Sequence, residues 1–231
     1  MSKLVLANLK MYQSTKESVD DYINKLKEVK DKFIVFPSTI YLEKFIQNNF
    51  TCGVQNASVH NPGPYTSEVS IHSLKNMGIK YVLLGHSEVR QNMAEDDELI
   101  NRKIKQALDN NLKVVLCIGE SLEAYNQSQT KIILKGQIEK ALKDISGEVI
   151  ISYEPVWAIG SGKTPTNNEI EDITKYIKSL FDYDVKVLYG GSVSDENINT
   201  LNEIPNVDGF LIGKAATVPS SLMKIIEVAE K

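Results

Sequence analysis

Eight short apolar runs alternate along the chain with longer segments of mixed polarity. Several runs are continuously apolar and rich in valine and isoleucine, which is typical of strands buried on both faces in a helix-covered parallel sheet. The predicted strands are Leu4–Ala7, Phe33–Phe36, Thr51–Val54, Tyr81–Leu84, Val114–Ile118, Val149–Tyr153, Val185–Tyr189 and Phe210–Ile212.

The segments between these runs carry apolar residues three or four positions apart, which is the spacing of one helix face. Turn and cap residues such as Asn110-Asn111 and Gly147 flank them. The longer predicted helices are Ser18–Lys32, Glu95–Asn110, about Lys131–Ile145, Asn168–Phe181 and Pro219–Glu230, and the shorter ones are Leu42–Gln47, Ser67–Met77 and Asp195–Leu201.

Strand and helix therefore alternate from end to end, and no Pro/Gly/Ser-rich linker interrupts them. This order predicts an α/β fold in which residues 1–231 form a single (β/α)₈ barrel domain. The competing fold is an open doubly wound sheet, which usually has a glycine-rich turn after its first strand. Here the segment from Asn8 to Tyr12 contains no glycine, which favours the barrel.

Composition narrows the possible partners and locations. The formal net charge of −4 gives no electrostatic reason to expect binding to nucleic acid or to an anionic membrane. No stretch approaches the ~20 apolar residues of a membrane span. Cys52 and Cys117 lie inside apolar runs and are not spaced as a metal-ligand pair. These features predict a cytoplasmic protein with two reduced, buried cysteines.

Polar and glycine residues collect directly after the predicted strands. In a (β/α)₈ barrel these positions form the catalytic rim at the C-terminal ends of the strands. The residues concerned are Asn8, Lys10, Gln55, Asn56, Gly85, His86, Ser87, Glu88, the segment from Glu154 to Thr164, Gly190, Gly191, Ser192, Gly213 and Lys214.

Three of these residues have side chains suited to catalysis. Lys10 supplies a fixed cation for a phosphate or a developing oxyanion. His86 follows a strand, and a helical turn opening at Ser87-Glu88 would favour the neutral ring. Glu154 ends a strongly apolar strand, and poor solvation makes a carboxylate a better base. Each also has a plainer interpretation, as a surface lysine, a structural histidine or a paired carboxylate.

The glycine-containing loops after the later strands indicate phosphate binding and a lid. Gly162-Lys163-Thr164 resembles the end of a P-loop, but Trp157 stands where that motif requires glycine. We therefore interpret the segment from Ala158 to Thr164 as a lid with Trp157 as its apolar anchor. Gly190-Gly191-Ser192 and Gly213 follow the seventh and eighth strands, the usual phosphate site of such barrels.

These segments together resemble the triosephosphate isomerase family, from Asn8 to about Ala216. The resemblance is carried by Asn8-Leu9-Lys10-Met11, Gly85-His86-Ser87-Glu88, Tyr153-Glu154-Pro155-Val156-Trp157-Ala158-Ile159-Gly160 and Tyr189-Gly190-Gly191-Ser192-Val193. It implies a cofactor-free and metal-free enzyme that interconverts dihydroxyacetone phosphate and D-glyceraldehyde 3-phosphate. Rival interpretations are another phosphosugar isomerase or epimerase barrel, or a catalytically silent barrel that acts as a binding protein.

The resemblance also implies a role for each site residue. Glu154 would carry the proton between carbon atoms, neutral His86 would polarise the carbonyl, and Lys10 would stabilise the enediolate. A glutamate base paired with a neutral histidine is an established catalytic pattern of this family. Asn8 would help to place the substrate, and Glu88 would support these groups from behind. Backbone N–H groups would bind the phosphate, namely those of Gly160, Ser192, Gly213 and Lys214.

The family is normally a homodimer in which the third loop enters the neighbouring subunit, and this loop would be Asn56–Glu68, with Thr66 near its tip. The sequence departs from the family at several positions. Tyr12 and Ser67 change the expected interface, and Pro165 changes the end of the lid. Lys214 stands where a second glycine is common at the phosphate, so its side-chain charge is new.

Overall fold

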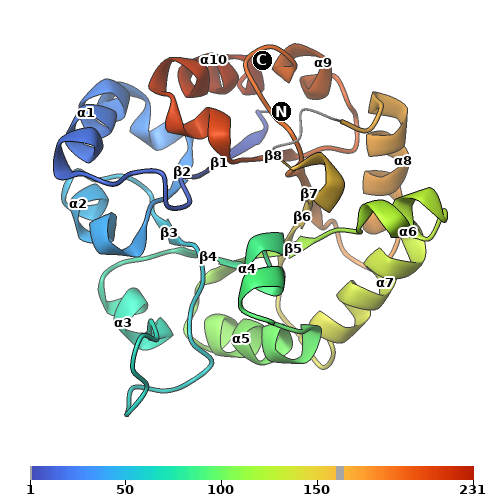
Figure 1. Ribbon diagram of the computed structural model, residues 1–231, viewed down its shortest axis with the longest axis horizontal. Coiled ribbons are helices and arrows are strands. Elements are labelled where there is room, and N and C mark those ends of the chain that lie inside the picture. Colours follow the sequence, from blue (N-terminus) through green and yellow to red (C-terminus); the bar gives the residue numbers. More distant parts are fainter. Residues whose placement is uncertain (1, 160–163) are drawn as a thin grey trace.

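The computed structural model describes residues 2–159 and 164–231. Among these residues, eight parallel strands form one sheet in the order β2-β1-β8-β7-β6-β5-β4-β3, and a parallel bridge between Val35 and Cys52 joins its two ends. The prediction of a (β/α)₈ barrel is confirmed (Figure 1). The strands are β1 (Leu4–Asn8), β2 (Ile34–Phe36), β3 (Gly53–Val54), β4 (Tyr81–Leu84), β5 (Lys113–Ile118), β6 (Ile150–Tyr153), β7 (Lys186–Tyr189) and β8 (Gly209–Ile212).

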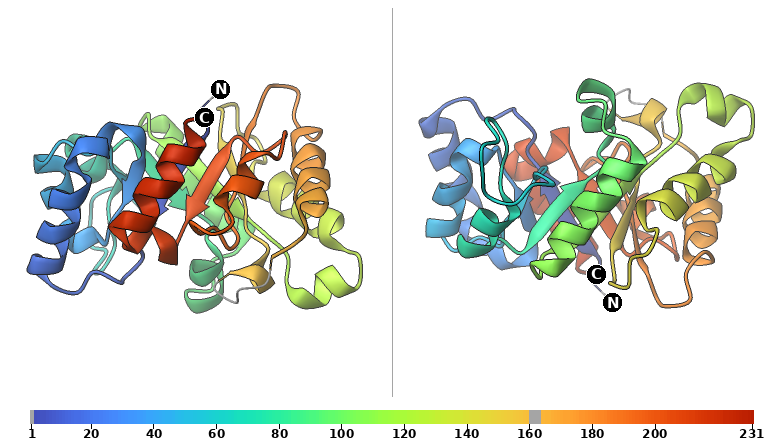
Figure 2. Two further views of the ribbon diagram at one scale, coloured as in Figure 1. Left: turned by 90° about the horizontal axis from the view of Figure 1, so that it is seen from above. Right: turned by 90° about the horizontal axis from the view of Figure 1, so that it is seen from below.

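The helices surround the barrel and cover its outer face (Figures 1 and 2). The α-helices are α1 (Lys16–Leu26), α2 (Leu42–Gln47), α3 (Ile71–Asn76), α4 (Ser87–Asn92), α5 (Asp97–Asp109), α6 (Leu122–Asn126), α7 (Thr130–Ala141), α8 (Asn167–Lys178), α9 (Ile198–Asn202) and α10 (Pro219–Ala229). Short 3₁₀ helices are η1 (Lys27–Lys32), η2 (Thr39–Tyr41), η3 (Val156–Ala158) and η4 (Lys214–Thr217). None of the helices in the described part of the chain is long and apolar enough to cross a membrane.

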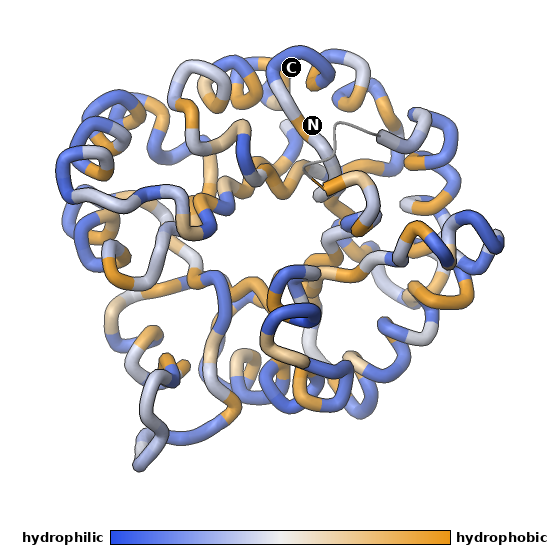
Figure 3. Tube along the Cα trace, in the orientation of Figure 1, coloured by the Kyte–Doolittle hydropathy of each residue, from blue (hydrophilic) through white to orange (hydrophobic). Residues whose placement is uncertain are grey.

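Strand side chains alternate between two apolar clusters, which explains why the runs read as continuously hydrophobic. In β1, Leu6 packs inside the barrel with Phe36, Leu83 and Leu188, whereas Val5 belongs to the cluster between the sheet and the helices. A parallel sheet covered on its outer face needs apolar residues at both positions. The outward surfaces of the helices are mainly hydrophilic (Figure 3).

Helix boundaries differ from the prediction where side chains cap the backbone. The first helix begins at Lys16 rather than Ser18, because the Thr15 hydroxyl accepts the Ser18 N–H at 3.1 Å. Its predicted end, Lys27–Lys32, is 3₁₀ helix.

Two further differences concern short helices. The predicted helix Ser67–Met77 begins only at Ile71, since Ser67 has a φ of 71°, in the left-handed region. Helix α6 was not predicted, although Ser121 caps it by accepting the Ala124 N–H at 3.2 Å.

The barrel interior depends on the fit of Phe36 against Gly53. Phe36 is fully buried, and a Cβ at Gly53 would lie 2.1 Å from its ring. We expect Phe36→Ala to lower the free energy of unfolding by about 3–5 kcal/mol, because the cavity cannot collapse inside a closed barrel. Urea denaturation followed by circular dichroism, at one fixed protein concentration, measures this.

Ile132→Ala is the matched control, because Ile132 is 71% exposed on α7. It should change the free energy of unfolding by less than about 0.5 kcal/mol. Equal losses for the two variants would contradict the assignment of Phe36 to the rigid interior.

Candidate active site

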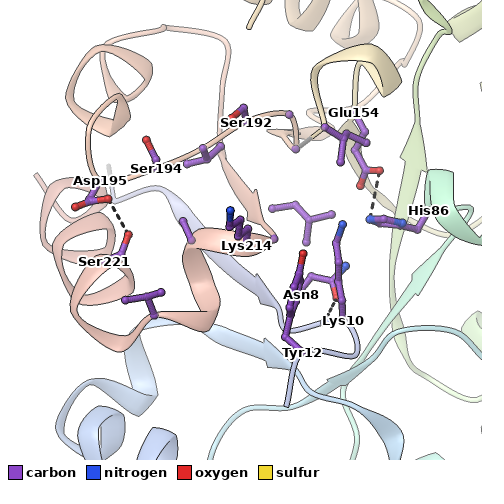
Figure 4. A pocket seen from close by; sticks show the side chains of 18 of the residues that line it. Asn8, Lys10, Tyr12, His86, Glu154, Ser192, Ser194, Asp195, Lys214 and Ser221 are labelled. Carbon is purple, nitrogen blue, oxygen red and sulfur yellow. Dashed lines mark hydrogen bonds and ion pairs between the residues drawn. The ribbon is translucent and has the colours of Figure 1, made fainter. Parts of the chain in front are cut away.

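A cavity of about 910 Å³ opens at the C-terminal ends of the strands. Helix α4 and the turn η3 lie on this side of the barrel (Figure 2). The residues predicted from the sequence that line the cavity are Asn8, Lys10, His86, Glu88, Glu154, Ser192, Gly213 and Lys214. The structure thus brings them into one pocket (Figure 4). The predicted phosphate-binding residue Gly160 lies outside the described residues.

Glu154 is a buried carboxylate immediately after β6. Its residue is 1% exposed, and neither carboxylate oxygen accepts a hydrogen bond from an N–H or O–H group of the described residues. The buried thiol of Cys117 lies beside it, and burial, together with the nearby Glu154 carboxylate, raises the pKa of that thiol. Its backbone N–H donates to the Ile118 carbonyl at 2.8 Å. Glycines make room on both sides, since a Cβ at Gly119 would lie 1.8 Å from the Glu154 carbonyl oxygen, and one at Gly190 would lie 2.7 Å from its Cγ. An unpaired, desolvated carboxylate is suited to removing a proton from a bound molecule.

His86 stands at the N-cap of α4, where the backbone fixes its ring. Its Nδ1 accepts the backbone N–H of Glu88 at 3.2 Å. A nitrogen that accepts a hydrogen bond carries no proton, so this contact favours the tautomer with its proton on Nε2. Nε2 points to Glu154 and lies 3.7 Å from its Oε2 (Figure 4). The predicted helical turn at Ser87-Glu88 is confirmed as the start of α4.

Arg90 holds the backbone beneath His86, a role that the sequence pattern does not indicate. Its Nε donates to the Gly85 carbonyl at 2.7 Å and its Nη2 to the Cys117 carbonyl at 3.3 Å. Asp97 holds the guanidinium through Nη1 at 2.6 Å. The ends of β4 and β5 are thereby joined directly below the pocket. The only signal in the sequence was a basic residue one helical turn after His86.

Lys10 is held in an unusual backbone conformation at the end of β1. Its φ of 49° lies in the left-handed region, which costs a non-glycine residue energy. Asn8 Oδ1 accepts its N–H at 3.1 Å, and Gln55 Nε2 donates to its carbonyl at 2.8 Å. The ammonium pairs with Glu88 Oε1 at 2.6 Å. Gln55 and Asn8 therefore fix the direction in which this cation enters the pocket.

The far end of the pocket is formed by the segments after β7 and β8. Gly213 precedes η4, and Lys214 begins it. The first N–H groups of a helical turn have no partner within the turn and are available to an anion. The Ser192 N–H faces the buried Tyr189 hydroxyl and offsets part of the rise that burial causes in the Tyr189 pKa.

A network around Glu120 anchors both described flanks of residues 160–163. Glu120 is fully buried and accepts hydrogen bonds from Trp157 Nε1 at 2.9 Å and the Tyr153 hydroxyl at 3.3 Å. The Tyr125 ring packs against Trp157 in a tilted arrangement, with ring centroids 4.4 Å apart and an interplanar angle of 38°, and its hydroxyl donates to Glu169 Oε1 at 2.7 Å. Trp157 is therefore held by a hydrogen bond in addition to the apolar anchoring that was predicted.

The fold and the site place the protein among the (β/α)₈-barrel enzymes. The family model for triosephosphate isomerase matches residues 3–229. Proteins named triosephosphate isomerase from Mycoplasmoides gallisepticum and Thermoanaerobacter pseudethanolicus are each 36% identical, over 98% and 96% of this chain and 98% of their own lengths. A third, from Thermodesulfovibrio yellowstonii, is 37% identical over 97% of this chain and 98% of its own. The chain belongs to the triosephosphate isomerase family, as the resemblance predicted.

Burial of Glu120 gives a pH-dependent contribution to stability. Desolvation raises the pKa of this carboxyl, and the hydrogen bonds from Trp157 and Tyr153 offset part of the rise. The native carboxyl therefore keeps its proton at pH values where the unfolded one has lost it, and native stability falls as pH rises through this window. We expect the free energy of unfolding of the wild type, relative to Glu120→Gln, to decrease between the ordinary carboxyl pKa and the raised one.

Urea denaturation at a series of pH values, followed by far-ultraviolet circular dichroism, measures this difference. Glu123→Gln is the control, since Glu123 is exposed on α6. A wild-type-minus-Glu120→Gln difference that stays flat or increases with pH would contradict the assignment.

Proposed function

We propose that the protein interconverts dihydroxyacetone phosphate and D-glyceraldehyde 3-phosphate by proton transfer through an enediolate. The observation that carries the proposal is the buried Glu154 carboxylate, which has no N–H or O–H hydrogen-bond donor among the described residues and lies 3.7 Å from Nε2 of His86. Membership of the triosephosphate isomerase family indicates the identity of the substrate. No step needs a metal or a cofactor, because a base and a hydrogen-bond donor suffice for this isomerisation.

The reaction moves one proton between neighbouring carbon atoms. Glu154 removes the proton from the hydroxyl-bearing carbon beside the carbonyl, and the electron pair of that C–H bond forms the enediolate double bond. His86 Nε2–H donates to the carbonyl oxygen, on which negative charge develops, and the Lys10 ammonium stabilises this charge. Glu154 then returns its proton to the former carbonyl carbon. Proton exchange between the two oxygens through His86 completes the conversion.

Binding of the phosphate keeps the triose aligned with Glu154, His86 and Lys10. We assign this role to the backbone N–H groups of Gly213 and Lys214 at the start of η4, with Ser192 and Gly160 as the further contributions that the family resemblance implies. Asn8 fixes the Lys10 loop, and Glu88 orients both His86 and Lys10 by the contacts described above. Exclusion of water matters because an exposed enediolate can eliminate its phosphate.

The length of the Glu154 side chain is decisive for the rate. Glu154→Asp withdraws the carboxylate by one methylene, so we expect kcat to fall by about 100-fold or more while KM changes little, because proton transfer depends on placement. A coupled assay with glyceraldehyde 3-phosphate in the presence of a chelator measures it. Glu123→Asp, on the surface of α6, is the matched control and should retain wild-type kcat.

An inactive but folded wild type would refute the proposed reaction. A Glu154→Asp variant with wild-type kcat would leave the reaction in place and refute Glu154 as the base.

We also propose that the protein is a cytoplasmic, single-domain enzyme that works as a homodimer through the loop Asn56–Glu68. This loop extends from β3 away from the barrel (Figure 1). Its base is fixed by a buried ion pair of Glu95 with Lys103, to which Asn56 is hydrogen-bonded, and within it His60 stacks on Tyr65. Several large apolar side chains are exposed near the same strand ends, namely Met11, Ile40, Tyr65 and Met93. Apolar groups gathered on one side are typical of an interface.

Disruption of this loop should separate the subunits. We expect light scattering to give about twice the chain mass of 25.8 kDa for the wild type, and a Tyr65→Asp variant to shift toward the single-chain mass, because burial of an unpaired carboxylate in the interface is unfavourable. Ile132→Asp, on the exposed face of α7, is the control and should stay dimeric. A wild type with the single-chain mass at micromolar concentration would contradict the proposal.

A further inference from the structure

The pocket contains a second lysine, whose ammonium has no partner within residues 2–159 and 164–231. Lys214 follows β8, and its side chain is exposed in the middle of the pocket wall (Figure 4). Its ammonium makes no ion pair or hydrogen bond with the described residues, whereas Lys10 is paired with Glu88 at 2.6 Å. The nearest acidic wall residue along the chain, Asp195, accepts a hydrogen bond from the Ser221 hydroxyl at 2.9 Å and forms no ion pair with Lys214.

The net charge of the pocket lining determines how strongly the Lys214 ammonium affects an incoming anion. Among the described lining residues there are three carboxylates, Glu88, Glu154 and Asp195, and two ammonium groups, Lys10 and Lys214. With His86 neutral, these described lining residues carry a net charge of −1, and they would carry −2 without Lys214. A substrate with a phosphate dianion has to enter against this negative charge. One uncompensated cation at the wall therefore has a large relative effect on the field that the anion meets.

Lys10 and Lys214 also converge on the same short stretch of backbone. A Cβ placed on Gly213 would lie 3.3 Å from Lys10 Cε and 3.7 Å from its Nζ, so Lys10 passes directly over the residue before Lys214. Lys10 therefore approaches Gly213 from across the pocket and Lys214 follows Gly213 in the chain, and of these two ammonium groups only that of Lys10 has a carboxylate partner among the described residues. A long flexible stem lets the free ammonium follow an anion that binds there.

We propose that the Lys214 ammonium is a second phosphate-binding cation, and that it acts through its side chain in addition to the backbone N–H. This rests on the proposed function and deepens it. The side chain makes the site selective for the dianionic form of a phosphate ester, and it makes substrate capture depend steeply on ionic strength, since the interaction is partly exposed to solvent.

Inorganic phosphate is the probe that isolates this charge from the chemistry. Lys214→Met keeps the backbone N–H and most of the side-chain volume while it removes the charge. We expect its inhibition constant for inorganic phosphate and its KM for glyceraldehyde 3-phosphate each to rise about tenfold, the range of a charge-assisted hydrogen bond at a partly exposed site. The kcat should fall by a smaller factor than KM rises. The decrease of kcat/KM with added salt should become shallower.

Two variants separate a local charge effect from a general one. Lys214→Arg keeps the cation and should restore most of the phosphate affinity. Lys224→Met removes the same charge from the exposed surface of α10 and should leave the inhibition constant and the salt dependence at wild-type values.

The outcomes distinguish this inference from the proposed function. A wild type that turns over the triose phosphate, together with a Lys214→Met variant that behaves like Lys224→Met, would refute the role of Lys214 alone. A folded wild type without turnover would refute the proposed function itself.

Discussion

Closure of the parallel barrel is the constraint on which the rest of the structure depends. The bridge between Val35 and Cys52 joins the two ends of the strand order, so all strands end at one rim. A closed ring places residues that are far apart in the chain side by side, and Asn8, His86 and Glu154 come from three such strand ends. The pocket exists because the interior below it is filled by packed side chains rather than by a channel.

At that rim two residues adopt energetically unfavourable states. Glu154 is buried with no N–H or O–H donor to either oxygen among the described residues, and Lys10 has a positive φ. Both are stabilised by their surroundings: Gln55 fixes the Lys10 carbonyl, and the close packing at Gly119 and Gly190 confines the Glu154 backbone and side chain. Strain held at a pocket by over-determined contacts is typical of a preorganised active site.

The sequence predicted the barrel and the residues that the structure brings to one pocket, because strands and strand ends depend on local patterns. Runs such as Tyr81–Leu84 coincide with the observed strand, and catalytic-rim positions follow directly from strand ends. Contacts between side chains of distant segments cannot be inferred from such local patterns. The support of Gly85 and Cys117 by Arg90, and the link from Glu120 through Trp157 to Tyr125, require side-chain geometry.

Backbone details were the other part that the sequence did not reveal. The late start of α3 after Ser67 and the cap that creates α6 depend on single dihedral angles and single hydrogen bonds, which a periodicity of apolar residues does not encode. The tautomer of His86 likewise follows from one N–H of the backbone at Glu88. These local bonds fix the orientation of the side chains to which we assign proton transfer.

We expect a proton, and not a hydride, to move between the carbon atoms of the substrate. Nuclear magnetic resonance of the triose phosphates after many turnovers in deuterium oxide tests it most directly. A carboxylate base that can exchange its proton with solvent predicts deuterium on the carbon atoms beside the carbonyl, in step with isomerisation. Complete conversion with no deuterium at these carbons would contradict proton transfer by Glu154 and point to a hydride shift.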